Sequence, residues 1–218
     1  MSVDAVPVTP VFDEAFRRDF EELVRWRRDV RRFRSTPVEP ELVNRLLSLA
    51  DCSPSVGNSQ PWRFVLVESE SIREDIRREF RRANAAALSK YQGEEAALYA
   101  RLKLSGLVEA PAHIAVFVDL ATGQGHGLGR DTMPEMLSYS VVTAVHTLWL
   151  AARIWGLGLG WVSIVDPEVV TRTIGVRESW RLVAYLCIGY PEEEHLDPEL
   201  ERRGWQSCTA TQARIFVR

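Results

Sequence analysis

The sequence has few cysteines and histidines, and each scarcity excludes a class of protein. Its 218 residues include three cysteines, Cys52, Cys187 and Cys208. They are odd in number and widely spaced, so they form neither a disulfide framework nor a CxxC pair, and they favour a reducing compartment. The four histidines are scattered and no HExxH motif occurs, which argues against a metal site.

The chain also lacks long apolar runs and an excess of positive charge. No run reaches the roughly 20 residues that a membrane-spanning helix needs. The first residues, MSVDAVPVTP, have neither the basic start nor the apolar stretch of a secretion signal. The formal net charge is −3, whereas non-specific binding to nucleic acid needs a broad basic surface. We therefore expect a cytoplasmic protein that binds neither membranes nor nucleic acid.

The spacing of apolar residues predicts one α+β domain, with helices outnumbering strands around a mixed sheet. Helices are predicted at 13–26, 40–51, 71–91, 94–106, 136–156 and 167–175, and strands at 62–69, 110–120, 158–165 and 180–191. Residues 1–12 are expected to form a loose arm and 192–218 an extended tail that ends in ARIFVR, a candidate strand or arm. No repeat or linker divides residues 1–218.

The stretch RWRRDVRRFR, residues 25–34, crowds six arginines around a single aspartate, Asp29. Cations near a helix C-terminus are favourable even when they stay in solvent. This interpretation is open for three of them: Arg25, Arg32 and Arg34. Guanidinium groups also hold phosphate bidentately, and Arg27 and Arg31 could be aimed at one anion. Asp29 is no phosphate ligand, so its charge would serve another part of the same molecule.

Two loops carry further polar or flexible groups. SPSVGNSQPW, residues 53–62, offers Ser55, Asn58 and Gln60 in a rigid turn, where they could read the edge of a heteroaromatic ring. An ordinary turn before a strand is the alternative. GQGHGLGR, residues 123–130, lacks the GK[ST] ending of a phosphate loop and is interpreted as a flexible loop or lid.

The glycines of GLGLGW, residues 156–161, stand at the start of a predicted strand, and their spacing does not match a dinucleotide fingerprint. Such glycines allow close backbone approach, either in a tight turn or against a flat ligand. Ser163 follows on the same predicted buried strand, where an isolated serine usually bonds the backbone.

Together these stretches resemble the FMN-binding nitroreductase superfamily. Its marks are a basic RRSxRxF-like stretch, a PSxxNxQPW-like loop and a glycine-rich strand entry, present here as RRDVRRF (27–33), PSVGNSQPW (54–62) and GLGLGWVSI (156–164). The order and spacing match from about residue 16 to 205. The resemblance implies a three-layer sandwich with a mixed central sheet, in an intertwined homodimer with two FMN sites at its interface. The nearly all-apolar segment 137–156 is consistent with burial there.

Within the superfamily the sequence most resembles the flavin destructases. Asp29 replaces the usual serine of RRSxR, Ser163 lies in GWVSI, and YARLKLSGL (99–107) and LGRDTMPEMLSYS (128–140) resemble segments that cover the flavin. This resemblance implies that reduced FMN and O₂ are substrates, cut to 5,6-dimethylbenzimidazole, the lower ligand of vitamin B12, and erythrose 4-phosphate. A separate flavin reductase would supply the reduced FMN.

The resemblance also assigns site residues. It implies Asp29 and Ser163 as catalytic groups. The implied FMN-binding residues are Arg27, Arg28, Asp29, Val30, Arg31, Pro54, Ser55, Asn58, Gln60, Arg101, Lys103, Gly158 and Gly160. Neighbouring guanidinium groups favour ionised Asp29 and desolvation opposes it, and the sequence does not decide between them.

Two other functions stay open. An NAD(P)H-dependent nitroreductase would recycle its FMN and would need room for nicotinamide over the ring. A flavin-binding module would store FMN without chemistry, but it would need neither Asp29 nor Ser163.

Overall fold

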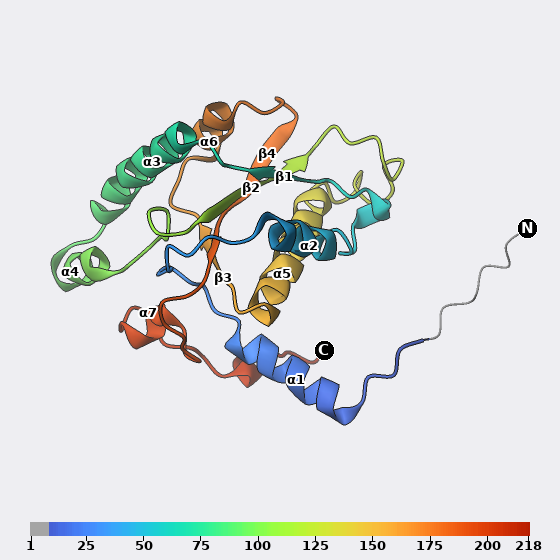
Figure 1. Ribbon diagram of the computed structural model, residues 1–218, viewed down its shortest axis with the longest axis horizontal. Helices are drawn as coiled ribbons and strands as arrows, with labels where there is room; N and C mark the ends of the chain where they lie inside the picture. The colour runs from blue at the N-terminus through green and yellow to red at the C-terminus, as the bar shows by residue number, and fades with distance from the viewer. Residues whose placement is uncertain (1–8) are drawn as a thin grey trace, which may run out of the picture.

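The computed structural model describes residues 9–218, which fold into a layer of helices, a sheet and a second layer of helices (Figure 1). The strands β1 (Trp62–Leu66), β2 (Ala112–Asp119), β3 (Gly158–Val162) and β4 (Trp180–Gly189) lie in the order β1-β2-β4-β3. All three pairings are antiparallel. The sheet predicted to be mixed has one parallel element within residues 9–218, a bridge between Asp29 and Leu159.

The helices start close to where the sequence predicts them. They are α1 (Glu14–Trp26), α2 (Pro40–Ala50), α3 (Glu70–Leu88), α4 (Gly93–Arg101), α5 (Met136–Ile154), α6 (Pro167–Ile174) and α7 (Glu199–Arg202), with short 3₁₀ turns η1 (Val56–Asn58) and η2 (Thr211–Arg214). The side chains of Asp13, Ser69 and Asp166 cap α1, α3 and α6 by accepting backbone N–H bonds. Within residues 9–218 no helix combines the length and the apolar character needed to cross a membrane.

The predicted ends of several elements were wrong. The helix predicted to reach residue 106 ends at Arg101, because the chain turns to extended backbone at Leu102. Strand β3 stops at Val162, which leaves Ser163 beyond it and exposed. The last residues, 213–218, form no strand within the described chain. Residues 1–8 of the predicted loose arm lie outside the described residues, and 9–12 are exposed coil.

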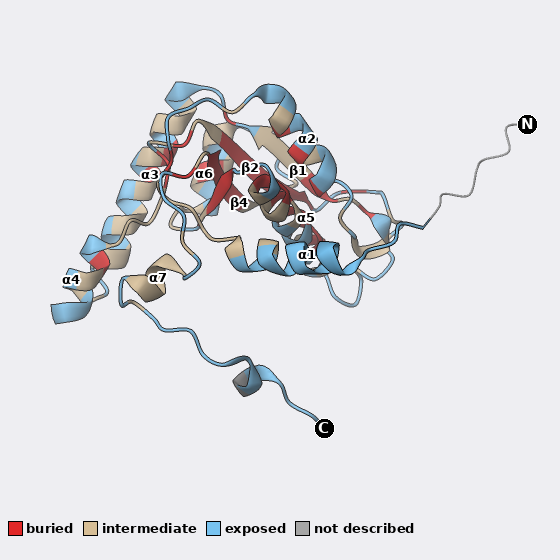
Figure 2. Cartoon of the chain, turned by 60° about the horizontal axis from the view of Figure 1, so that its bottom comes forward, coloured by how far each residue is buried: buried red, intermediate tan, exposed pale blue. Residues whose placement is uncertain are grey.

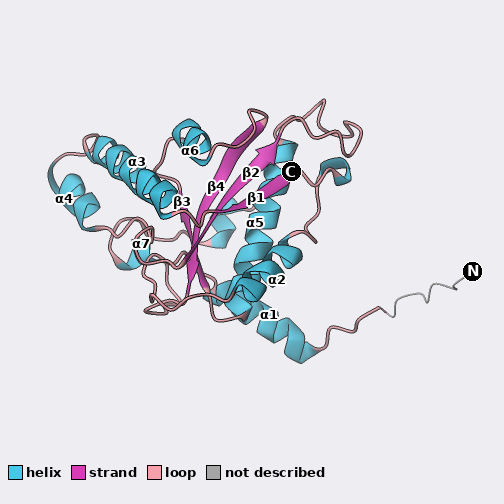
Figure 3. Ribbon diagram, turned by 45° about the horizontal axis from the view of Figure 1, so that its top comes forward, coloured by secondary structure: helices cyan, strands magenta, loops and turns pink. Residues whose placement is uncertain are grey.

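The two central strands bury side chains on both faces, which produces two cores. Alternate residues of β2 and β4 face α2 and α5, including Ile114, Val116 and Leu186. The intervening residues, including Phe117 and Tyr185, face α3 and α6. The sheet therefore lies between these two helix pairs (Figure 3). This arrangement holds β3 at the sheet edge, where the site is built.

Apolar side chains on α1 remain half exposed. Phe16, Phe20 and Val24 keep 50%, 49% and 43% of their surface accessible, and no residue of α1 is buried. The helix and the tail after α7 therefore lie on the surface (Figure 2). The exposed residues on the tail include Ile215, Phe216 and Val217.

One buried polar group makes the stability of the fold depend on pH. His113 is 3% exposed, and its Nδ1 lies 3.0 Å from the hydroxyl of Tyr185. Burial, helped by the nearby Arg73 charge, lowers the pKa of His113 to about 3. Between about pH 6.5 and 3 the unfolded chain therefore binds a proton that the folded chain does not.

The free energy of unfolding should consequently fall as the pH drops through this window. Lowering the pH from about 6.5 to 5 removes up to about 2 kcal/mol. We expect His113→Gln to abolish that part of the loss, as measured by urea unfolding at pH 7 and 5. His146→Gln, at an exposed position, is the matched control. If the free energy of unfolding fell equally between pH 7 and 5 in His113→Gln and in the unaltered protein, the prediction would be contradicted.

Candidate active site

The arginine-rich segment leaves α1 and lies along the exposed edge of β3. Val30 N–H donates to the carbonyl of Leu159 at 3.1 Å, and Arg34 N–H donates to the carbonyl of Tyr190 at 2.8 Å. A bridge between Phe33 and Pro191 adds a second pairing. The segment thus acts as a short extra strand, which fixes the direction of each side chain between residues 27 and 34.

Two glycines make this approach possible. A Cβ on Gly158 would lie 2.6 Å from Val30 Cγ2, and one on Gly160 only 2.1 Å from the carbonyl oxygen of Val30. The close approach that the sequence predicts for these glycines is therefore made to Val30 of the same chain, to its side chain at Gly158 and to its carbonyl at Gly160. Direct contact of either glycine with FMN stays a prediction.

Asp29 is the carboxylate at the centre of this segment. Its Oδ1 accepts from the backbone N–H of Trp161 at 3.0 Å, and its Oδ2 accepts from Arg31 Nε at 2.7 Å. Its side chain keeps 28% of its surface exposed, so the fixed carboxylate still faces an opening. Burial raises the pKa of Asp29 even though Arg31 and the Trp161 N–H oppose the rise. Desolvation thus has a larger effect on the pKa of Asp29 than the opposing guanidinium charge. The sequence alone left this balance open.

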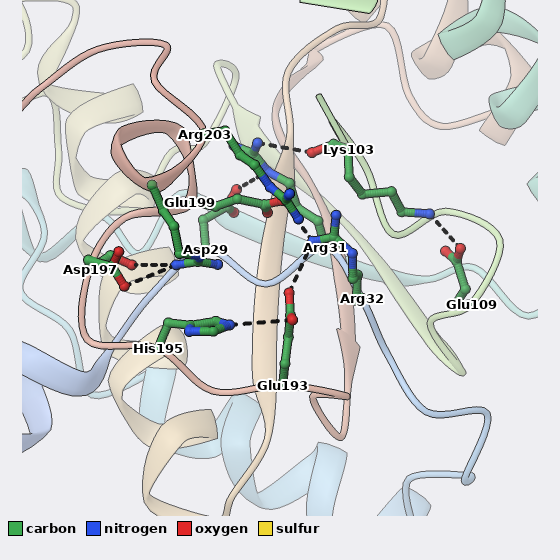
Figure 4. Close-up of polar contacts among 11 residues, drawn as sticks. Asp29, Arg31, Arg32, Lys103, Glu109, Glu193, His195, Asp197, Glu199 and Arg203 are labelled. Atoms are coloured by element: carbon green, nitrogen blue, oxygen red, sulfur yellow. Dashed lines mark hydrogen bonds and ion pairs between the residues drawn. The ribbon is translucent and has the colours of Figure 1, made fainter. Parts of the chain in front are cut away.

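Arg31 joins Asp29 to the segment after α4. Its Nη1 donates to the carbonyl of Lys103 at 3.0 Å, while its Nε holds Asp29. The ammonium of Lys103 in turn lies 2.5 Å from Glu109 Oε1 (Figure 4). Arg31 therefore lies at Asp29, with the backbone of Lys103 beside it, and binding of FMN by either residue stays a prediction. Arg101 does not lie there, because its guanidinium folds back onto the carbonyl of Ala97 in its own helix.

The other arginines have different roles. Arg28 donates to the carbonyl of Leu196 at 2.5 Å and to that of Arg27 at 2.7 Å. Arg32 is no solvated cation, because it pairs with Glu199 at 2.7 Å and Glu193 at 3.2 Å. Arg25 does fit the solvated interpretation, with an exposed pairing to Glu21 at 3.6 Å.

The guanidinium of Arg27 makes no hydrogen bond among those within residues 9–218. Its guanidinium lies over the ring of Trp149, with the central carbon 4.8 Å from the ring centroid. Burial and the adjacent Arg28 charge lower the pKa of Arg27. A partly desolvated guanidinium whose donors are free is well suited to bind an anion.

Sequence reasoning missed the acidic partner of this segment. The tail at 192–203, PEEEHLDPELERR with its leading proline, contains six acidic residues, and two of them, Glu193 and Glu199, pair with Arg32. Glu193, Glu199 and Asp197 all lie beside the arginine segment in Figure 4. The complementary charges of the two stretches were the available signal. They enclose a cavity of about 50 Å³, far smaller than the 300–1,000 Å³ of a usual ligand pocket.

The predicted turn at 54–60 forms a second cluster. Gly57, Asn58 and Gln60 have φ angles of 57°, 54° and 41°. Positive φ is uncommon for residues other than glycine and concentrates at functional sites. Gln60 N–H donates to Ser55 Oγ at 3.0 Å, which closes the turn. Ser59 Oγ is buried and makes no hydrogen bond within residues 9–218.

Helix α5 separates the two clusters within one chain. Near its start, Ser140 accepts from Val56 N–H at 3.0 Å, and Thr143 donates to the carbonyl of Pro54 at 3.1 Å. Nine residues after Ser140, the indole of Trp149 donates to the carbonyl of Arg28 at 3.2 Å. At 1.5 Å per residue this amounts to roughly 14 Å along the helix. The described chain thus does not bring the 54–60 turn to Asp29.

Ser163 belongs to neither set of hydrogen bonds. It stands two residues beyond Trp161, or roughly 7 Å further along the direction of β3, and its side chain is exposed. The prediction of a serine on a buried strand was therefore wrong in its burial. Its catalytic role stays a prediction. No cluster of three or more His, Cys, Asp or Glu residues suited to a metal occurs within residues 9–218.

Comparison with known proteins places this arrangement in a family. The family model described as "Nitroreductase family" matches residues 24–190, which include both clusters. The chain belongs to the nitroreductase family. It is 59% identical over 198 residues to the 5,6-dimethylbenzimidazole synthase of Rhodospirillum rubrum, covering 91% of this chain and 94% of the relative. It is 46% identical to the 5,6-dimethylbenzimidazole synthase of Rhodobacter capsulatus, covering 92% and 97%.

Solved structures agree with this assignment. The crystal structure of oxidized iodotyrosine deiodinase bound to FMN and 3-iodo-L-tyrosine superposes with a TM-score of 0.68 at 28% identity, covering 80% of this chain and 91% of that chain. A nitroreductase-like protein from Streptococcus mutans also gives 0.68, at 17% identity, covering 92% and 98%. The α+β nitroreductase fold predicted from the sequence is confirmed, as is the resemblance to the destructase branch.

Proposed function

We propose that this protein is a 5,6-dimethylbenzimidazole synthase that fragments reduced FMN with O₂, releasing erythrose 4-phosphate. The observation that carries the proposal is Asp29, a desolvated carboxylate held by Trp161 N–H and Arg31. Relatives up to 59% identical bear the name of this activity. FMN is then a substrate that is consumed, and a separate reductase must supply its reduced form.

The chain offers groups for the steps that such a cleavage needs. Because erythrose 4-phosphate has four carbons and the ribityl chain five, C1′ stays with the benzimidazole and the C1′–C2′ bond is broken. This requires a proton to be removed from ribityl C1′. A carboxylate whose pKa is raised toward neutrality is a better match for proton transfer than an ordinary one. Two fixed hydrogen bonds orient the Asp29 oxygens, so little reorganisation is needed. We assign Asp29 as the base and Ser163 as a hydroxyl that orients or relays a proton.

The test is a single turnover. Protein loaded with FMN is reduced photochemically without nicotinamide, air is admitted, and 5,6-dimethylbenzimidazole is measured by mass spectrometry. Product in proportion to the flavin lost is expected. Quantitative return of oxidised FMN without a new aromatic product would overturn the proposal. NADPH oxidation with a nitroaromatic acceptor would then test a reductase that recycles FMN.

We further propose a homodimer in which each FMN lies between two copies. The Asp29 cavity is too small for FMN, and the 54–60 turn of the same chain lies roughly 14 Å away along α5. A second copy could supply that turn. The half-exposed apolar residues of α1 and the tail give such a copy a surface to cover. Analytical ultracentrifugation tests this, because a monomer that still binds FMN would contradict it.

Arg27 is the arginine best placed to bind the FMN phosphate. Replacing it with alanine should weaken FMN binding about 10- to 100-fold, since hydrogen bonds to charged groups contribute about 1.5–3 kcal/mol. Riboflavin, which lacks the phosphate, should bind equally well to both proteins. Fluorescence titration measures both ligands, and Arg25→Ala, with its exposed side chain, is the control. Equal weakening for riboflavin would show that Arg27 does not recognise phosphate.

A further inference from the structure

The glycine-rich loop at 121–134 and the turn at 56–60 are packed backbone to backbone. A Cβ on Gly57 would lie 2.9 Å from the carbonyl oxygen of Leu128. A Cβ on Gly125 would lie 2.6 Å from the carbonyl oxygen of Gly57. Neither contact leaves room for a side chain. The segment interpreted from the sequence as a flexible loop or lid is thus docked on the turn and supports its unusual backbone.

One side chain of this loop reaches the two polar residues of the turn. Gln124 Nε2 donates to the carbonyl of Asn58 at 2.8 Å and to Gln60 Oε1 at 2.8 Å. The amide nitrogen has two hydrogens, so both are used. The carbonyl end of Gln60 is therefore occupied. Its own NH₂ group makes no hydrogen bond among those described for residues 9–218.

This contact decides which end of Gln60 a ligand meets. The two ends of a glutamine amide are similar in size, and the terminal torsion has two nearly equivalent orientations. Without a fixed partner, Gln60 could present either its carbonyl or its NH₂ group. Gln124 offers a donor at this position, so it favours the orientation that leaves the Gln60 NH₂ free.

We propose that Gln124 is a positioning residue that makes Gln60 a hydrogen-bond donor toward a carbonyl oxygen on the pyrimidine edge of FMN. This inference rests on the proposed function, and it states how the 54–60 turn of the same site recognises FMN. The 54–60 turn then recognises acceptors on the ring, while the Asp29 cluster serves the ribityl and phosphate end. Gln124 itself does not touch the flavin.

A double-mutant cycle tests this coupling. Gln124→Ala should weaken FMN binding about 3- to 10-fold, the effect of one neutral hydrogen bond. The same change in a Gln60→Ala background should have no further effect on FMN binding. The absorption maximum of bound FMN should shift to the same position in both single variants. Gln92→Ala, at an exposed glutamine without a side-chain cap bond, should behave as the unaltered protein.

Gln60→Glu separates orientation from packing. The carboxylate keeps an acceptor for Gln124 Nε2 but offers FMN an oxygen in place of a donor. We expect FMN binding to fall at least about tenfold, with an unchanged midpoint of urea unfolding. Unimpaired FMN binding by Gln60→Glu would overturn the inference.

If the losses of FMN affinity in Gln60→Ala and Gln124→Ala added up in the double variant, the inference would also be overturned. Gln124 would then support the turn without acting through Gln60. In that case the proposed function would stand, provided that the unaltered protein still forms product. Failure of the unaltered protein to bind FMN would overturn both.

Discussion

Asp29→Asn is expected to retain bound FMN and to lose at least about a hundredfold in the rate of 5,6-dimethylbenzimidazole formation. A positioned acid or base contributes about 10²- to 10⁴-fold to a rate. Asparagine has nearly the shape of aspartate and can still accept from Trp161 N–H. It cannot also accept from Arg31 with its NH₂ group, so a small loss of stability accompanies the loss of the base.

The pH dependence of the single turnover gives an independent check. Burial raises the pKa of Asp29, so the rate of the unaltered protein should fall with decreasing pH at a higher pH than an ordinary carboxyl group would give. This acidic limb should disappear from the residual rate of Asp29→Asn. Asp29→Ser should likewise bind FMN without forming product.

The control is Asp75→Asn, at an exposed carboxylate of α3 paired with Arg78. It should leave the rate, the pH profile and FMN binding unchanged. Product formation by Asp29→Asn at a normal rate would show that Asp29 is not the base. Loss of FMN binding in that variant would instead make it a binding residue alone.

Gly160→Ala is expected to damage both stability and activity, although only one methyl group is added. The new Cβ would lie 2.1 Å from the carbonyl oxygen of Val30, and real Cβ atoms essentially never approach within 3.0 Å. The arginine segment must therefore move away from β3 by roughly 1 Å. This breaks the pairing of Val30 with Leu159 and displaces Asp29 from Trp161 N–H.

We expect a loss of about 1–3 kcal/mol in the free energy of unfolding, typical of overpacking. Product formation should fall about a hundredfold, because a displacement of this size at a reacting group has such an effect. Urea unfolding and the single-turnover assay measure the two quantities. Gly123→Ala is the matched control, since no atom lies within 4 Å of its added Cβ. Equal changes in unfolding free energy and product formation in Gly160→Ala and Gly123→Ala would refute the role given to Gly160.

The sequence predicted most of the fold because local rules and tertiary packing agree over long elements. The 3.6-residue spacing of apolar residues was sufficient to place α1 and α2. The errors fell where local signals were weak. LKLSG continues an apolar pattern after Arg101 but becomes extended, and β3 ends before Ser163 although WVSIV reads as one strand.

By itself the sequence determined the chemical groups of the candidate site: an aspartate among arginines, a polar turn and glycines before a strand. Only the tertiary structure decided how these groups are used. It pairs Arg32 with Glu199, places the Arg27 guanidinium over Trp149 without a hydrogen bond to residues 9–218, and raises the pKa of Asp29 through burial. It also separates the turn from Asp29 along α5. The physical reason is that hydrogen-bond partners and desolvation depend on distances in space. Residues 161 positions apart, such as Arg32 and Glu193, have no relation in sequence that fixes those distances.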